Sequence, residues 1–291
     1  MFFRTDLALE ANEQAGQKID GVVLTENKID DVNIVKMKIT THAAAECLNK
    51  PQGTYITIEV PAFTDNYHSP FDKAEIIATE IRSLLPKKGL VVVVGLGNCN
   101  ITPDNLGPMT AKNILATRHI TGELARSTGL SNLRPVAVLA PGVLGQTGIE
   151  SAELIDSINK KLNPCAVIVI DALASMRLER LGCTVQLSDS GISPGAGVNN
   201  SRPRINRSTL GVPVISMGVP TVVDALTLAC DLTGDSREQL EKKTSPRGEI
   251  MMVTPREIDL LIERASKLSG MAINCALQPD FSIEDISMLM S

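Results

Sequence analysis

The sequence predicts an α/β fold: a mainly parallel, doubly wound sheet flanked by helices, with a smaller β-rich addition at the N-terminus. Through the middle of the chain, short apolar runs alternate with helical patterns, as strands buried on both faces of a parallel sheet require. Before them, apolar and polar residues alternate with a period of two, which is typical of half-exposed antiparallel strands. We expect residues 1–70 to form the addition and residues 71–291 the α/β core, together one compact unit.

In the N-terminal region, the runs at 32–38 and 54–60 mix apolar and polar residues with a period near two, so each predicts a strand with one buried face. The period then changes, because apolar residues at 71–85 fall on one helical face and Pro86 follows. We expect this helix to lead into the core.

The core is predicted from four apolar runs and the helical stretches between them. Because parallel strands are joined by right-handed crossovers, this order indicates an open sheet with a crevice at the carboxyl ends of its strands. The predicted strands are 90–94, 136–140, 166–170 and 214–217, and the predicted helices are 106–126, 151–162 and 173–181. Apolar spacing from Ile258 onward predicts further helices packed on the sheet.

Composition excludes several classes of protein. Of the 291 residues, 43% are apolar and 21% charged, as in ordinary globular proteins. Only 2% are aromatic and the net charge is −5, so we expect no direct nucleic-acid binding. The six cysteines form no CxxC pair, which is typical of reduced thiols in a cytoplasmic protein. The longest apolar runs are too short for a membrane span.

Two acidic residues are predicted at the same edge of the sheet. Asp171 directly follows the 166–170 run, and Asp104 lies in the turn after 90–94. A carboxyl pair in such a crevice can act as general base and general acid on water. Alternatively, each acid caps the helix that follows it. The spacing alone leaves both interpretations open.

The glycine-rich turn between Gly95 and Asn98 allows a sharp bend at the tip of a strand. We expect the N–H groups of Gly97 and Asn98 to point into the crevice, where a peptide carbonyl or its oxyanion can accept them. The turn also resembles part of a dinucleotide-binding fingerprint, but Asn100 stands where its third glycine belongs. A nucleotide- or dinucleotide-binding enzyme is therefore an alternative function, and a non-catalytic assembly or regulatory protein is a third.

A loop at 191–200 contains Gly195 and Gly197 and precedes a group of cations: Arg202, Arg204 and Arg207. We expect the two glycines and Arg202 to bind substrate, because guanidinium groups attract acidic side chains and carboxylates. An ordinary solvent-exposed loop is the alternative.

Other motifs are weaker. Asp189-Ser190-Gly191 matches the short signature of pepsin-like aspartic proteases, but one copy in an α/β chain indicates coincidence. The three histidines, His42, His68 and His119, have no metal-ligand spacing.

Five longer segments are more specific. They are RTDLA at 4–8, GLGNCNITPDNLGP at 95–108, PGVLGQTGIE at 141–150, IDALA at 170–174 and GVPTVVDA at 218–225. Together they resemble the spore germination protease family over nearly the whole chain.

The resemblance implies an endopeptidase that begins the degradation of small acid-soluble spore proteins in the spore core. It implies Asp104 and Asp171 as catalytic residues, a fold similar to hydrogenase-maturation proteases, and a homotetramer. In those relatives the acids and a histidine hold a metal. No histidine is placed to match, so we expect an aspartic-type mechanism without a cofactor, with a divalent metal at the two acids as the alternative.

The chain departs from the family in two places. The family is made as a zymogen with an N-terminal prosegment, whereas only three residues precede Arg4. We therefore expect a mature or truncated form, or a different means of control. Residues 197–201 read GVNNS where GVGNK is expected, which leaves the substrate fit near Gly197 open.

Overall fold

A single large sheet organises the computed structural model, which describes residues 5–16, 18–65, 71, 73–195, 202–245 and 248–290. Within these ranges nine strands lie in the order β1-β2-β3-β7-β8-β6-β4-β5, and β9 pairs with β8. Strands β8, β6, β4 and β5 run parallel to one another. The neighbouring pairs β1–β2, β2–β3, β3–β7 and β7–β8 are antiparallel. The strands are β1 (Val22–Ile29), β2 (Val32–Ile39), β3 (Gly53–Glu59), β4 (Val91–Gly95), β5 (Val136–Leu139), β6 (Ala166–Ser175), β7 (Thr184–Ser188), β8 (Val214–Asp224) and β9 (Met252–Val253).

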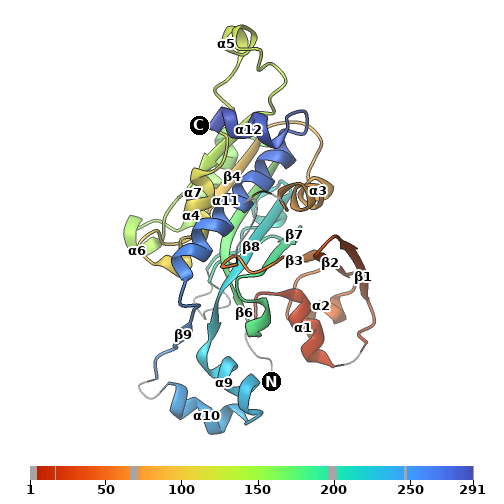
Figure 1. Cartoon of the computed structure of the whole chain (residues 1–291), viewed down its shortest axis with the longest axis vertical. Coiled ribbons are helices and arrows are strands. Elements are labelled where there is room, and N and C mark those ends of the chain that lie inside the picture. Colours follow the sequence, from red (N-terminus) through yellow and green to blue (C-terminus); the bar gives the residue numbers. More distant parts are fainter. Residues whose placement is uncertain are drawn as a thin grey trace.

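Helices cover both faces of this sheet, with the long helix α11 lying along the parallel strands (Figure 1). The helices are α1 (Ala8–Ala15), α2 (His42–Leu48), α3 (Ala74–Leu84), α4 (Leu106–Lys112), α5 (Gly122–Ser127), α6 (Leu144–Thr147), α7 (Ser151–Leu162), α8 (Arg207–Leu210), α9 (Ala225–Thr233), α10 (Arg237–Thr244), α11 (Ile258–Leu277) and α12 (Ile283–Met290), with 3₁₀ turns η1 (Thr102–Asp104) and η2 (Leu178–Arg180). The predicted α/β class is confirmed. None of the described helices is both long and apolar enough to cross a membrane.

The two faces of the parallel strands bury different cores, because successive side chains of a strand point to opposite sides. Val91 and Val93 of β4 pack with α3, α4 and α11. Val92 and Val94 pack with α7 and α8 on the other face. This double burial explains why the parallel strands have continuous apolar sequences.

The N-terminal strands belong to the same sheet as the core. β1, β2 and β3 form an antiparallel meander, and β3 joins it to the rest through β7, where Tyr55 pairs with Ser188. Helices α1 and α2 bury their apolar side chains against β2 and β3. The division of the chain at residue 70 stays a prediction.

Two predicted helices are wrong in extent. The 106–126 helix is interrupted between α4 and α5, because Thr117 bonds to the start of β5: its N–H donates to Val136 O at 3.0 Å. The 173–181 helix is absent from this described stretch, because β6 continues to Ser175 by pairing with β8. Asp171 therefore lies inside a strand, not at its tip.

Candidate active site

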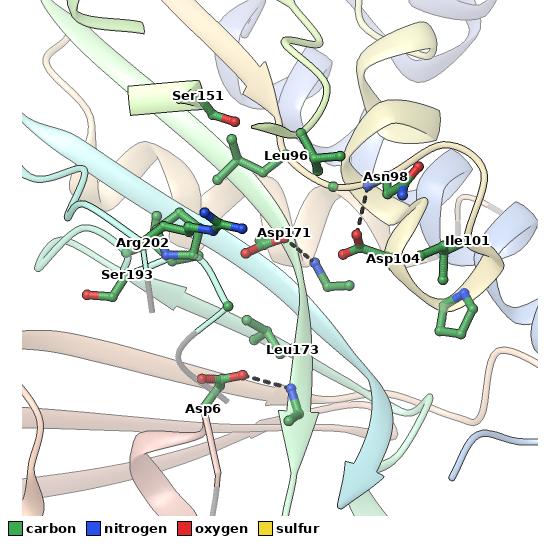
Figure 2. Close-up of a pocket in the computed structure, with 18 of the residues that line it drawn as sticks. Asp6, Leu96, Asn98, Ile101, Asp104, Ser151, Asp171, Leu173, Ser193 and Arg202 are labelled. Carbon is green, nitrogen blue, oxygen red and sulfur yellow. Dashed lines mark hydrogen bonds between the residues drawn. The ribbon is translucent and has the colours of Figure 1, made fainter. Parts of the chain in front are cut away.

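A cavity of about 500 Å³ lies where β4 ends beside β6, and both predicted acids line it (Figure 2). β4 ends at Gly95 and turns away, while β6 continues past it, so the side chains of Asp171 and Asp104 meet the same space. Apolar side chains form much of the wall: Leu96, Ile101, Val143, Leu144, Ile192 and Val222. The cavity therefore combines a polar floor with surfaces suited to an apolar or extended chain.

Asp171 is the more deeply buried acid, with 7% of its surface exposed. Its Oδ1 accepts the N–H of Ala172 at 3.0 Å. Burial, followed by the negative charges of Asp104 and Asp6, raises the pKa of Asp171 well above its usual range. A carboxyl group in such surroundings holds its proton when an ordinary aspartate has lost it.

Asp104 is half-buried at the end of η1. Its Oδ2 accepts the N–H of Asn98 at 2.8 Å. Burial raises the pKa of Asp104, while this hydrogen bond acts in the opposite direction by stabilising the ionised form. The two acids thus differ in environment, as a proton donor and a proton acceptor must.

Close packing holds the turn that carries Asp104. Gly97 has a φ of +121°, and a Cβ there would collide with the carbonyl oxygen of Asp104. The register between β6 and β8 shifts after Leu173, leaving an extra residue in β8 at Thr221. Thr221 Oγ1 donates to the carbonyl oxygen of Pro103 at 2.8 Å. This irregularity thereby ties β8 to the turn beside Asp104.

The interpretation of the acids as helix caps is wrong. Asp171 is followed by further strand, not by a helix. The Asp104 side chain bonds back to Asn98 instead of to α4, whose N-cap is Asn105 without a side-chain bond.

Four of the five predicted substrate-binding residues line the cavity: Gly97, Asn98, Gly195 and Arg202. Gly197 lies outside the described residues. The Asn98 N–H already donates to Asp104, so it is less available to a substrate carbonyl, or to a nucleotide phosphate, than the sequence indicates. Arg202 Nη1 donates to Glu150 Oε1 at 3.1 Å, and both side chains line the cavity.

The remaining motif residues lie elsewhere. Arg204 lines a neighbouring cavity of about 370 Å³, and Arg207 begins α8. Asp189 Oδ1 accepts the N–H of Thr54 at 2.7 Å, where β7 leaves β3. The Asp189-Ser190-Gly191 triplet thus has a structural bond and no place in the cavity that holds Asp104 and Asp171.

Two acids that line the cavity were not predicted as site residues: Glu150, which bonds to Arg202, and Asp6. Asp6 belongs to the RTDLA motif, which was the only signal for it, since no periodicity connects the N-terminus with β6. Its side chain lies beside β6 in Figure 2, with a hydrogen bond to the strand.

A metal site built from protein side chains alone needs ligands besides the two carboxylates. In the described ranges, no three His, Cys, Asp or Glu side chains converge so that they could hold a metal ion. The described residues thus offer no three-ligand set, so no step is assigned to a metal, and a divalent metal at the two acids stays a prediction.

The fold and this cavity define an α/β protein with an unequal carboxyl pair at the carboxyl end of its parallel strands. The family described as germination protease matches residues 4–236. The chain belongs to the germination protease family and is a peptidase.

Individual relatives agree over the full length. A germination protease of Clostridium perfringens is 39% identical, covering 99% of each chain, and one of Caldanaerobacter subterraneus is 41% identical, covering 99% of this chain and 98% of its own. The NiFe hydrogenase maturation protease HycI from Thermococcus kodakarensis resembles the structure with a TM-score of 0.39 and 16% identity, over 68% of this chain and 98% of its own.

Proposed function

We propose that this peptidase is an endopeptidase that begins the degradation of small acid-soluble spore proteins during germination, with Asp104 and Asp171 activating water. The observation that supports it most is the unequal pair of acids in one cavity. Asp104 has a hydrogen-bond donor for its charge, whereas Asp171 is buried with two other acids acting on it.

In the proposed reaction, ionised Asp104 takes a proton from a water molecule as the water attacks the peptide carbonyl carbon. Protonated Asp171 donates its hydrogen to the carbonyl oxygen, which would otherwise carry a full negative charge in an apolar cavity. The tetrahedral intermediate then collapses: the carbon–nitrogen bond breaks, and the amine leaves with the proton that Asp104 received. One hydroxyl group of the intermediate returns its proton to Asp171 as the new carboxyl group forms, which restores both acids.

The cavity walls support binding of an extended peptide. Ile101 offers apolar surface near Asp104, while Ser193 and Arg202 offer polar groups on the other side of Asp171 (Figure 2). Pro103 and Met252 add apolar surface to the cavity wall. We propose action in the spore core and assembly as a homotetramer, on the strength of the family resemblance.

The test is cleavage of a purified small acid-soluble spore protein, with the products mapped by mass spectrometry. Asp104→Asn and Asp171→Asn are each expected to fold normally and to lower kcat by about 100-fold or more, because each removes a proton-transfer group. An unrelated unfolded protein is the substrate control, and circular dichroism checks the fold. Near-normal turnover by both variants would refute the roles assigned to Asp104 and Asp171. Equal cleavage of the control protein would refute the proposed specificity for small acid-soluble spore proteins.

A further inference from the structure

Asp6 is fixed to the strand that carries Asp171. The N–H of Asp6 donates to Ala174 O at 2.8 Å, and the Ala174 N–H donates back to Asp6 Oδ2 at 2.8 Å. Asp6 therefore lies beside β6 just beyond Asp171, where β4 has already turned away. The side chain lines the same cavity as both proposed catalytic acids.

Several contacts hold this segment in place. Lys50 Nζ donates to the carbonyl oxygens of Thr5 at 2.9 Å and Asp6 at 3.1 Å. The fully buried Glu10 accepts the N–H groups of Met176 at 2.7 Å and Arg177 at 3.1 Å. The N-terminal segment and the end of β6 thus form one bonded unit, so the Asp6 carboxyl has a defined position.

Asp171 and Asp6 have different charged groups beside them. Asp171 is influenced by Asp104 from η1 and by Asp6 from the N-terminal segment. Arg202 lines the cavity but is paired with Glu150. Asp6 has a cation beside it, Lys50, which also interacts with Glu10, and Arg204 lines the neighbouring cavity that Asp6 shares. Of the two acids on β6 and its bonded segment, Asp6 is the one with a cation beside it.

We propose that Asp6 is a positioning residue for the peptidase reaction: its carboxylate, held by Ala174 and accompanied by Lys50, keeps the proton on Asp171. This proposal rests on the roles proposed for Asp104 and Asp171. In physical terms, a fixed negative charge near Asp171 opposes the loss of its proton, so the acid stays ready to donate while Asp104 remains the base. Burial raises the pKa of Asp6 and lowers the pKa of Lys50. The Lys50 charge and the Ala174 hydrogen bond reduce the rise at Asp6, and the charges of Asp6 and Glu10 reduce the fall at Lys50.

The test is the pH dependence of kcat/KM in the Asp6→Asn variant. The asparagine side-chain oxygen can still accept the Ala174 N–H, so the segment stays docked while its charge is removed. The alkaline limb, where Asp171 loses its proton, is expected to move to lower pH by about one pH unit, and the acid limb, set by Asp104, is expected to stay.

Glu10→Gln is the matched control. Glu10 lies in α1, directly after the segment, and accepts N–H groups of the residues that follow β6, but it does not line the cavity and is not among the charges acting on Asp171. This variant is expected to unfold more easily and to leave the alkaline limb unchanged. If it moves the limb as far as Asp6→Asn does, docking of the segment and not the Asp6 charge sets the limb, and the proposal is overturned.

A titration without substrate separates this proposal from the proposed function. The carboxyl ¹³C signal of Asp171, assigned by its absence in Asp171→Asn, is followed against pH with and without Asp6→Asn. A lower titration midpoint in Asp6→Asn supports the proposal even if no peptide is cleaved. An unmoved midpoint in an active protease overturns it and leaves the proposed function standing.

Discussion

The peptide N–H of Asn98 donates to the carboxylate of Asp104 at 2.8 Å, so a single turn both carries this acid and stabilises its charge. The side-chain hydrogen bond of Asp104 thus comes from its own turn, while Thr221 of β8 bonds to the neighbouring Pro103. The geometry depends on a backbone bend at Gly97, and this dependence can be tested directly.

Gly97→Ala is expected to misplace Asp104, because the φ of +121° is strained for alanine and its Cβ would collide with Asp104 O. We expect kcat to fall by about tenfold to 100-fold and stability by about 1–3 kcal/mol, measured by steady-state kinetics and urea unfolding. Gly211→Ala is the control, since Gly211 has a φ of +74° with nothing within 4 Å. If both variants lost the same stability and kept normal kcat, the predicted collision between a Cβ added at Gly97 and Asp104 O would not control the placement of Asp104.

Asp171→Asn is expected to change how stability depends on pH. In the folded protein, burial and the charges of Asp104 and Asp6 raise the pKa of Asp171. Above the unfolded value of about 3.9, the folded chain therefore binds more protons than the unfolded chain, and this contribution to stability is lost as pH rises through the folded pKa.

Urea unfolding of both proteins across pH 3 to 8 checks this expectation. Asp171→Asn should be more stable than the unsubstituted protein near neutral pH, and the two should converge at the acid end. The asparagine oxygen can still accept the Ala172 N–H, so both proteins keep this hydrogen bond and differ only in the ionisable group. A constant difference at every pH would contradict the altered pKa.

Arg202→Gln is expected to weaken binding of substrates with an acidic residue beside the scissile bond. The guanidinium lines the cavity and is shared with Glu150, so a substrate carboxylate must compete for it. We expect KM to rise by about tenfold with a smaller change in kcat. Arg207→Gln, outside the cavity lining, is the control. An unchanged KM for such peptides rules out this role for Arg202.

Dialysis against a strong chelator is expected to leave cleavage unchanged. The described residues gather no three-ligand site at the acids, so the proposed chemistry uses carboxyl groups and water alone. Residual activity is measured before and after dialysis, and again after adding Zn²⁺ or Mn²⁺. Loss of activity that an added ion restores would replace the aspartic mechanism with a metal-assisted one.

The sequence predicted the parallel strands well because burial on both faces demands runs such as the valines of β4. It failed where local preference and tertiary pairing conflict. Residues 172–175 read ALAS, which favours a helix, yet pairing with β8 keeps them in β6. β1 was missed because most of its side chains are exposed and carry no alternating apolar pattern.

For the site, the apolar runs that precede Asp104 and Asp171 were enough to predict that the two acids share a crevice, although Asp171 lies inside β6 and not at its tip. The inequality between the acids did not, because it depends on burial and on which N–H groups point at each carboxyl. The place of Asp6 in the cavity could not be predicted for another reason. Its contact with Ala174 joins segments far apart in the chain, and local periodicity carries no information about such contacts.

The pairing of β3 with β7 has a consequence for how the chain folds. Tyr55 meets Ser188 only after the whole segment between them has been synthesised and β7 can form. Loop-closure entropy must be overcome before this contact contributes, which slows the non-local pairing. During synthesis, the β3 edge of the β1–β3 meander therefore stays unpaired until β7 has formed. Pairing of the N-terminal strands with the core is expected to be a late event in folding.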